Sequence, residues 1–391
     1  MEFRDAAEYS DFRQEVRDFI DTNLPADWAN TRYDMDDNES AEETRKFWKA
    51  LADRRWLAMA WPEEYGGQEA DHWQQLVMNE EMAYNRAPGA GGNMGIMWVG
   101  PALMLYGTDE QKERYVKDIA SGDVWWCTLY SEPGAGSDLA SLQTRAVEDG
   151  DDYIINGQKI WTSGAHHSDW GWLAARTDPD APKHKGVTMF MVDMKSPGVT
   201  TRPLINMADS HSFNEVFFED VRIPKTQVVG EVNRGWYHMA VALDFERSGI
   251  GAFAGGRRQV EELHQYAQER PELVASNPAV RYELADRAIE VAVGTNLAYR
   301  ITHLQKQSVV ANYEASVSKL YGSELGQRIA STGLKLVGQY GTLNGSDDGY
   351  SPMDGRLATS YRNAVAGTIA AGTSEIQRGI IATRGLGLPR Q

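Results

Sequence analysis

The sequence predicts an α+β protein in which a helical region, a β region and a second helical region follow one another. Two observations support this order. Apolar residues recur at helical spacing up to about residue 120 and again after Gly235. Between them lie short strand-like runs separated by glycine, proline and aspartate. At roughly 100–200 residues per domain, 391 residues suggest two or three domains, and we expect boundaries at 1–122, 123–233 and 234–391.

The first region is predicted to be helical throughout. Apolar residues alternate with charges at helical spacing at Phe12, Val16, Phe19 and Ile20. This helix should end before Pro25, because proline disfavours the helical conformation in the residue before it. Further helices are expected over 42–56 and 72–84, with a glycine loop over 64–67 between them. Thr108, followed three residues later by Gln111, is typical of a helix capping box.

The middle region has the pattern of a small antiparallel β domain. Aliphatic and aromatic runs recur between turn residues, and the expected strands cover 144–147, 153–156, 171–176, 188–192 and 215–218. Turns are predicted at Asp149-Gly150, at Asn156-Gly157 and over 196–198. After Gly235 the periodicity is helical again, with helices expected over 236–246, 257–268, 280–306 and 313–336. These are long enough to form a bundle.

Charge and composition argue against several classes of protein. Lys and Arg number 39 against 56 Asp and Glu, a net charge of −17, and such an acidic surface repels phosphate backbones. The one cysteine, Cys127, excludes an intramolecular disulfide and any site built from several thiolates. No apolar run approaches the roughly 18 residues of a membrane helix, and the N-terminus lacks a signal-peptide layout. We therefore expect a soluble cytoplasmic protein.

Several familiar motifs occur without the context that they need. Gly249–Ala254 matches a dinucleotide-binding fingerprint, but a helical segment precedes it where that fingerprint needs a strand. Ser316–Lys319 matches Ser-x-x-Lys in the middle of an expected helix, with no companion motif. His166-His167 could suggest a metal site, but neighbouring residues on a strand or loop should point apart. We assign no function to these three matches.

Two middle-region segments are far more specific. Tyr130–Leu142 reads YSEPGAGSDLASL, and Asn156–Gly164 reads NGQKIWTSG. Together they resemble the acyl-CoA dehydrogenase family, FAD-containing enzymes that desaturate acyl-CoA thioesters between Cα and Cβ. The resemblance extends over nearly the whole chain, through Asn214–Pro224 (NEVFFEDVRIP), Gly230–Trp236 (GEVNRGW) and Ala371–Arg378 (AGTSEIQR). It implies an N-terminal α-helical domain, a middle antiparallel β-barrel domain and a C-terminal four-helix bundle.

The resemblance also implies where FAD would bind. Thr128, Leu129 and Ser131 match the stretch that lines the edge of the isoalloxazine ring, and Gly134 and Gly136 allow close approach of backbone to a ligand. The other matching positions are Ser137, which contacts both flavin and the pantetheine arm, Trp161 and Ser163, which lie beside the ring, and Thr373 and Glu375, which meet the ribityl and adenine region. Lys335 stands where a glutamine often precedes Gly338, and both are expected near the cofactor.

The catalytic base departs from the commonest pattern of the family. Abstraction of a Cα proton needs a carboxylate whose pKa is raised by desolvation. The commonest members place that glutamate directly before the C-terminal Gly-Thr, where this chain has Ala371. The segment Leu243–Ser248 (LDFERS) resembles the helix that supplies the base in the isovaleryl-type branch, which implies Glu246 as the base and Arg247 as a neighbouring active-site arginine.

Substrate contacts follow from the same resemblance. In the family the backbone N–H at position 371 polarises the thioester carbonyl, and alanine keeps that N–H. The expected substrate-binding residues are Ser137, Asp244, Phe245 and Ala371. Small residues fill Ser248–Gly256 directly after the expected base, either for close helix packing or to leave room for a wide acyl group. Segments 161–166 and 176–186 resemble subfamilies that act on bulky or polycyclic acyl-CoAs, so we expect a bulky or branched acyl chain.

Three functional readings remain open. In the first, the chain is a catalytic dehydrogenase that passes electrons to electron-transfer flavoprotein, as a homotetramer or homodimer. In the second, which Ala371 suggests, it is a non-catalytic or half-site subunit of a heteromer. The family element Arg-x-x-Phe-Gly, which reaches the FAD of a neighbouring subunit, is missing, and Arg270 is a doubtful substitute. In the third, the enzyme is an oxidase that uses O₂ directly.

Overall fold

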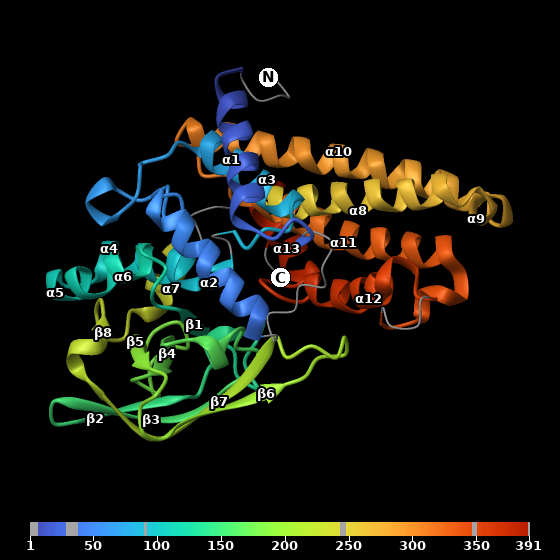
Figure 1. The fold of residues 1–391 in the computed structure, drawn as a ribbon. Coiled ribbons are helices and arrows are strands. Elements are labelled where there is room, and N and C mark those ends of the chain that lie inside the picture. Colours follow the sequence, from blue (N-terminus) through green and yellow to red (C-terminus); the bar gives the residue numbers. More distant parts are fainter. Residues whose placement is uncertain (1–6, 29–37, 90–91, 243–247, 346–349, 390–391) are drawn as a thin grey trace. The chain divides into compact units, whose positions relative to one another are not determined.

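The structure is a computed structural model of the chain and describes residues 7–28, 38–89, 92–242, 248–345 and 350–389. The chain forms two compact units (Figure 1). The first unit comprises residues 1–32, 71–87 and 247–391, and the second comprises 33–70 and 88–246. The predicted order of helical, β and helical regions is confirmed. The domain boundaries expected after 122 and 233 stay a prediction, since this division follows three-dimensional contacts and separates the N-terminal helices from one another.

The first unit is all-helical among its described residues. Its α-helices are α1 (Ser10–Asn23), α3 (His72–Tyr84), α8 (Ile250–Glu269), α9 (Pro271–Ser276), α10 (Ala279–Lys306), α11 (Asn312–Val337), α12 (Arg356–Gly367) and α13 (Ser374–Ile380). Helices α8, α10 and α11 run alongside one another (Figure 1). They pack closely around the buried ring of Phe253, since a Cβ at Gly294 would lie 2.2 Å from its Cδ1 atom and a Cβ at Gly322 would lie 3.3 Å from its Cε1 atom.

The glycines at the start of α8 face α3. A Cβ at Gly251 would lie 3.6 Å from the Cβ of Ala83, and one at Gly255 would lie 3.9 Å from the Ala83 carbonyl oxygen. Helix α8 begins at Ile250 with Gly249 as N-cap in the left-handed conformation (φ 70°). Among the described residues, the element before α8 is helix α7 (Gly235–Ala242) and not the strand that a dinucleotide fingerprint needs. Close packing against α3 accounts for part of the small-residue run.

Helix α1 is held on α3 by buried carboxylates. Glu80 and Glu81 are almost completely buried, and Arg13 forms ion pairs with both. Arg17 adds a bond from its Nε atom to Glu81 Oε2 at 2.8 Å. Burial alone would raise the pKa of Glu81, but hydrogen bonds from Arg17 and Arg13 outweigh it and lower that pKa. The N-terminal helix is thus attached by charge pairing as well as by its apolar face.

The second unit combines short helices with one sheet of eight strands. Its α-helices are α2 (Asn38–Asp53), α4 (Gly100–Tyr106), α5 (Asp109–Gln111), α6 (Lys117–Ala120) and α7 (Gly235–Ala242). The strands are β1 (Trp126–Leu129), β2 (Arg145–Asp149), β3 (Asp152–Lys159), β4 (Trp170–Arg176), β5 (Val187–Asp193), β6 (Val199–Leu204), β7 (Phe213–Pro224) and β8 (Val228–Val229). The predicted capping box is confirmed, since Thr108 Oγ1 accepts from Gln111 N and Gln111 Oε1 accepts from Thr108 N.

The sheet follows the order β6-β7-β3-β2-β4-β5-β8, with β1 paired to β4. The predicted β region is confirmed, but two pairings differ from the expected antiparallel arrangement. Strand β1 runs parallel to β4, and β2 meets β4 in parallel at Arg145 and Arg176. A hairpin turn joins antiparallel neighbours, whereas β1 enters the sheet from helix α6 and is therefore free to pair in parallel. Strands β1, β6 and β8 were not expected.

One predicted turn is wrong. Asn156-Gly157 lies inside β3, where the register against β7 shifts between Ile155 and Gly157, so the pair forms a bulge within a continuous strand. A Cβ on Gly157 would lie 2.6 Å from Thr144 Oγ1, which explains the glycine without a turn. The turns at Asp149-Gly150 and Pro197-Gly198 are confirmed, and both glycines have positive φ.

Candidate active site

The first candidate site segment is the loop after β1 in the second unit. Glu132 and Ala135 close a tight turn through reciprocal backbone hydrogen bonds of 3.0 Å. Gly134 and Gly136, on either side of Ala135, are exposed, and no protein atom lies within 4 Å of a Cβ built at either position. Neither has a positive φ. Protein packing and backbone conformation therefore leave these glycines unexplained, and close approach of a ligand is a fitting reason.

A buried ion pair fixes this loop to β3. Lys159 is fully buried and its Nζ lies 2.7 Å from Glu132 Oε1 and 3.0 Å from the Tyr130 carbonyl oxygen. The Glu132 carboxylate also accepts from the backbone N–H groups of Gln143 at 2.6 Å and Thr144 at 2.9 Å. Burial lowers the pKa of Lys159 to about 8, although Glu132 opposes the shift. Both ends of the loop are thus held by one carboxylate.

The second segment is the turn that follows β3. Trp161 has a left-handed backbone (φ 60°), and its side chain is 56% exposed. The Ile160 N–H donates to the Ser131 carbonyl oxygen at 2.9 Å, which places this turn beside the first loop. Ser163 is exposed, whereas Thr162 between them is buried. The structure therefore brings together the predicted residues Ser131, Trp161 and Ser163.

The remaining predicted residues of this unit lie on or near the same segments. Thr128 and Leu129 belong to β1, where they pair with Trp172 and Leu173 of β4. Leu129 is completely buried and Thr128 is half-buried, so only Thr128 keeps a partly accessible side chain. Ser137 lies on the exposed part of the loop beyond Gly136.

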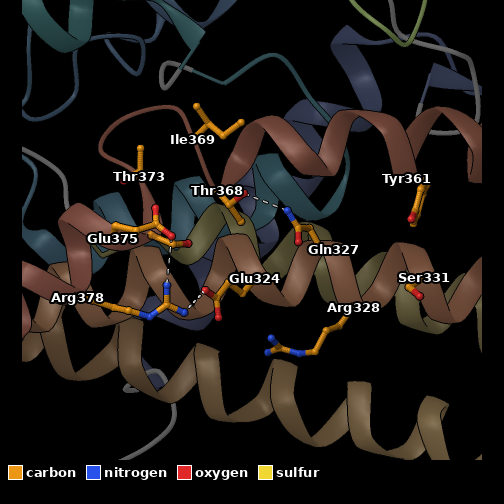
Figure 2. A pocket seen from close by; sticks show the side chains of 11 residues that line it. Glu324, Gln327, Arg328, Ser331, Tyr361, Thr368, Ile369, Thr373, Glu375 and Arg378 are labelled. Atoms are coloured by element: carbon orange, nitrogen blue, oxygen red, sulfur yellow. Dashed lines mark hydrogen bonds and ion pairs between the residues drawn. The ribbon is translucent and has the colours of Figure 1, made fainter. Parts of the chain in front are cut away.

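The first unit contains a cavity of about 670 Å³, within the usual range for small-molecule sites. Figure 2 shows it among side chains of α11, α12 and α13. Its lining residues are Glu324, Gln327, Arg328, Ser331, Tyr361, Thr368, Ile369, Thr373, Ser374, Glu375 and Arg378. Arg378 bonds Glu324 at 2.6 Å and lies 3.8 Å from Glu375. Two of the predicted cofactor residues, Thr373 and Glu375, therefore line one cavity.

The lysine of the Ser316–Lys319 match holds the loop before α13. Lys319 Nζ, from the middle of α11, donates to the Gly372 carbonyl oxygen at 2.6 Å and to that of Gly367 at 3.1 Å. Gln377 Nε2 reaches the carbonyl oxygens of Ala371 and Gly372 at 3.3 and 3.4 Å. Ala371 is exposed and has a positive φ of 52°. No local pattern could have identified Lys319, because its partners lie about 50 residues further along the chain.

Other predicted residues are not brought to this cavity. Lys335 forms an ion pair of 2.8 Å with Glu283 near the end of α11, and Gly338 is exposed just beyond that helix. Neither lines the cavity. Arg270, the doubtful substitute for the missing arginine motif, lies 3.9 Å from the centre of the Tyr266 ring and bonds Glu269.

The expected catalytic residues Glu246 and Arg247 and the expected substrate contacts Asp244 and Phe245 lie outside the described residues. His166 and His167 do not point apart as expected. They belong to a 3₁₀ turn (Ala165–His167), and their ring centres are 4.0 Å apart. Across the described parts of the chain, no group of three or more His, Cys, Asp or Glu side chains is arranged to hold a metal ion. Within those same ranges no helix has the length and apolarity to cross a membrane.

Comparison with known proteins gives a family match over most of the chain. Three models match, described as the N-terminal domain (residues 6–123), the middle domain (127–221) and the C-terminal domain (233–386) of acyl-CoA dehydrogenase. Acyl-CoA dehydrogenase IpdE1 of Mycobacterium tuberculosis is 35% identical over 97% of this chain and 98% of its own length. Acyl-CoA dehydrogenase FadE34 of the same organism is 38% identical over 89% of this chain, which spans about half (47%) of that longer protein.

Solved structures agree with this family match. The Tcur3481-Tcur3483 steroid ACAD superimposes with a TM-score of 0.90 at 34% identity, covering 100% of both chains. The ChsE4-ChsE5 complex from Mycobacterium tuberculosis gives a TM-score of 0.86 at 33% identity, again with 100% of both chains covered.

Proposed function

Because the chain belongs to the acyl-CoA dehydrogenase family of FAD-dependent oxidoreductases, we propose that it binds FAD and desaturates a bulky or branched acyl-CoA thioester between Cα and Cβ. The observation that carries the proposal is the junction of two segments in the second unit. There the backbone hydrogen bond from Ile160 to Ser131 places the exposed, left-handed Trp161 beside the loop that carries Gly134 and Gly136.

The residues around this junction suit a flavin. Trp161 offers an exposed apolar ring, and Thr128, Ser131 and Ser163 offer hydroxyl and backbone groups for the edge of an isoalloxazine. Gly134 lets backbone approach a ligand without a Cβ in the way. When bound, FAD supplies the redox chemistry by accepting the hydride that leaves Cβ. The protein's part is to bind and orient the cofactor and the thioester.

In the first unit, Thr373 and Glu375 are proposed to meet the ribityl and adenine region. Both line the cavity of about 670 Å³, together with polar and charged side chains such as Gln327 and Arg328 (Figure 2). Polar groups in a cavity of this size fit the hydroxyls and ring nitrogens of a dinucleotide. Lys335 and Gly338 stay proposed cofactor residues, although neither lines the cavity.

The proton chemistry is assigned to Glu246, with Arg247 beside it. The base must be within hydrogen-bond reach of the Cα proton, and Ala371 has no group that could accept it. The Ala371 backbone N–H is proposed to donate to the thioester carbonyl oxygen, which stabilises the negative charge that develops there. Lys319 and Gln377 support that role, because both bond carbonyl oxygens of the loop that carries Ala371.

The acyl group and the partners are proposed from the relatives. The chain is similar over its full length to a steroid ACAD, which favours a ring-bearing or branched acyl group over a short straight one. Electron-transfer flavoprotein is the proposed electron acceptor. A homotetramer or homodimer is the proposed assembly. A heteromer is the alternative, since another similar structure is the ChsE4-ChsE5 complex.

Anaerobic flavin bleaching tests the reaction. The purified chain should be yellow and should lose its flavin absorbance faster with a ring-bearing or branched acyl-CoA than with butyryl-CoA. Glu246→Gln should keep FAD bound and slow bleaching by at least about a hundredfold, the usual scale for a general base. Glu272→Gln is the control for loss of a single glutamate charge, because Glu272 is exposed on α9. Flavin bleaching at the wild-type rate in Glu246→Gln would contradict the assignment of Glu246 as the base. Faster bleaching with butyryl-CoA than with a ring-bearing or branched acyl-CoA would contradict the proposed substrate class.

A further inference from the structure

We propose that Asn214 is a positioning residue of the flavin site, whose buried carboxamide fixes the Trp161 turn by bonding Thr162 and two histidines, His166 and His211. The inference rests on the proposed function, since the Trp161 turn is assigned there to the isoalloxazine. Asn214 lies on β7 and the turn follows β3, so all these residues belong to the second unit.

The turn needs an external support. A residue other than glycine with positive φ is strained, and this conformation persists only when its surroundings hold it there. The Trp161 ring is largely exposed. It contacts the Phe213 ring edge-to-face, with the two ring centres 5.8 Å apart. Side-chain burial therefore does little to offset the strain. A strained, exposed aromatic residue is a feature of functional sites.

The support comes through the next residue. Thr162 is buried, and its backbone N–H donates to the backbone carbonyl oxygen of Asn214 at 3.0 Å. Its own carbonyl oxygen accepts from both the N–H of Asn214 at 3.0 Å and the Nδ2 of Asn214 at 3.1 Å. Thr162 is thus bonded to Asn214 three times, directly after the strained residue.

The donor pattern around Asn214 can be satisfied in one way. Because Nδ2 faces a carbonyl oxygen, it is the amide nitrogen, and its second proton points to His166 Nδ1 at 3.0 Å. His166 Nδ1 must then accept, which requires a neutral imidazole. Oδ1 in turn accepts from His211 Nε2 at 2.8 Å. Burial, together with His167 and His211, lowers the pKa of His166 to about 4 and so keeps it neutral.

The charged surroundings leave this pattern undisturbed near neutral pH. His211 stacks on His166 with ring centres 4.0 Å apart, and His167 lies equally close on the same short turn. On the strands that pack against this turn, Arg202 of β6 lies over the Phe217 ring and Glu215 of β7 accepts from Gln158. Asn214 itself is completely buried. Aspartate at position 214 would place a second acceptor against the Thr162 carbonyl oxygen.

Asn214→Asp tests the role without changing side-chain size. At about pH 8 the variant should exchange the backbone amides of 160–164 about five- to tenfold faster than wild type, because one buried hydrogen bond is lost. FAD binding should weaken by a similar factor. At about pH 6 both effects should shrink, since burial raises the pKa of a carboxyl, and the protonated carboxyl donates again to the Thr162 carbonyl oxygen. Hydrogen exchange by mass spectrometry at matched pH measures the turn even without flavin.

Asn156→Asp is the control. Asn156 also donates from Nδ2 between β3 and β7, to Asp220 Oδ1 at 2.9 Å, but both residues are exposed. Its variant should leave exchange of 160–164 and FAD affinity within about twofold of wild type. Wild-type exchange and FAD affinity in Asn214→Asp at both pH values would overturn the inference. If protection of 160–164 and FAD affinity fell by the same factor at about pH 6 and at about pH 8, the inference would also be overturned, because such a loss reflects general destabilisation of the fold. Protection of the turn in a wild-type chain that binds no FAD would overturn the proposed function alone.

Discussion

The buried ammonium of Lys159 shows how a single residue determines the conformation of a loop. It bonds the Glu132 carboxylate and the Tyr130 carbonyl oxygen inside the β unit, and Glu132 in turn bonds two backbone N–H groups. A buried pair of this kind contributes little compared with an apolar pair of the same size, but removal of one partner leaves an uncompensated charge. The pair therefore matters mainly for the geometry of the loop between Tyr130 and Thr144.

Lys159→Met should lower the free energy of unfolding by about 3–5 kcal/mol, because Glu132 would remain buried and unpaired. The double variant Lys159→Met/Glu132→Leu should recover part of that loss. Denaturant titration of the three proteins measures it. Lys195→Met provides the control, since the ion pair of Lys195 with Asp169 is exposed and long at 3.6 Å. A loss below about 1 kcal/mol for Lys159→Met would show that the pair is dispensable.

Gly157 in the β3 bulge shows a second effect on the scale of one residue. Gly157→Ala should be clearly more destabilising than Gly150→Ala, because a Cβ at Gly157 would lie 2.7 Å from the Thr144 Cα atom, whereas at Gly150 nothing lies within 4 Å. Both glycines have positive φ, so Gly150→Ala isolates backbone strain at about 1–2 kcal/mol. Thermal unfolding compares them. Equal losses of stability in the two variants would mean that the Thr144 backbone moves away from the new Cβ at little cost.

On the scale of elements, the attachment of α1 to α3 depends on pH. Arg17 and Arg13 lower the pKa of Glu81 despite its burial. A carboxyl with a lowered folded-state pKa gives stability that is fully present above its unfolded pKa, about 4.3. That stability is lost as pH falls through the folded value. The first unit should therefore become less stable below about pH 4, with α1 affected first.

Glu81→Gln isolates this contribution. The variant should lose about 1–3 kcal/mol of unfolding free energy at neutral pH, the usual worth of hydrogen bonds to a charged group. It should also show a flatter dependence on pH between about 3 and 5 than wild type. Unfolding titrations across that range measure both. Glu42→Gln, at an exposed Lys46 pair on α2, should leave the pH dependence unchanged. A wild-type pH profile in Glu81→Gln would contradict the assignment.

At the scale of the whole molecule, the surface of α10 bears on the proposed assembly. Tyr282, Ile289 and Val293 recur at helical spacing on this helix and are 74%, 62% and 46% exposed. An apolar row on a helix surface is typical of an interaction site. With a homo-oligomer as the proposed assembly, we expect this face to contact a second copy of the chain.

Ile289→Asp should therefore shift the purified chain toward smaller species, because burial of a carboxylate in an apolar interface is costly. Light scattering coupled to gel filtration measures the shift. Val147→Asp is the control, since Val147 is 59% exposed on β2. An unchanged mass in Ile289→Asp would place the interface elsewhere. A wild-type chain that is monomeric on its own would favour the heteromer instead.

The sequence determined the regular helices well, because their periodicity and caps are local. Helix α3 begins and ends where it was predicted, and α11 differs by one residue at each end, but α8 begins at Ile250, seven residues before the predicted start at 257. The sequence predicted the strands of the sheet less well. Strand β1 has four residues and pairs in parallel with a distant strand, and no residue of β6 is buried, so neither has an alternation of buried and exposed residues that predicts a strand. Asn156-Gly157 has the composition of a turn, yet its partners on β7 keep β3 continuous.

The sequence alone identified the family and most of the proposed site, because the motifs Tyr130–Leu142 and Asn156–Gly164 are each contiguous in the chain. Only the tertiary structure showed what holds those motifs in place. The Lys159–Glu132 pair, the Asn214 network and the Lys319 bonds each join segments between 27 and 53 residues apart. Such contacts leave no local periodicity, since a donor and its acceptor become neighbours only when the chain has folded.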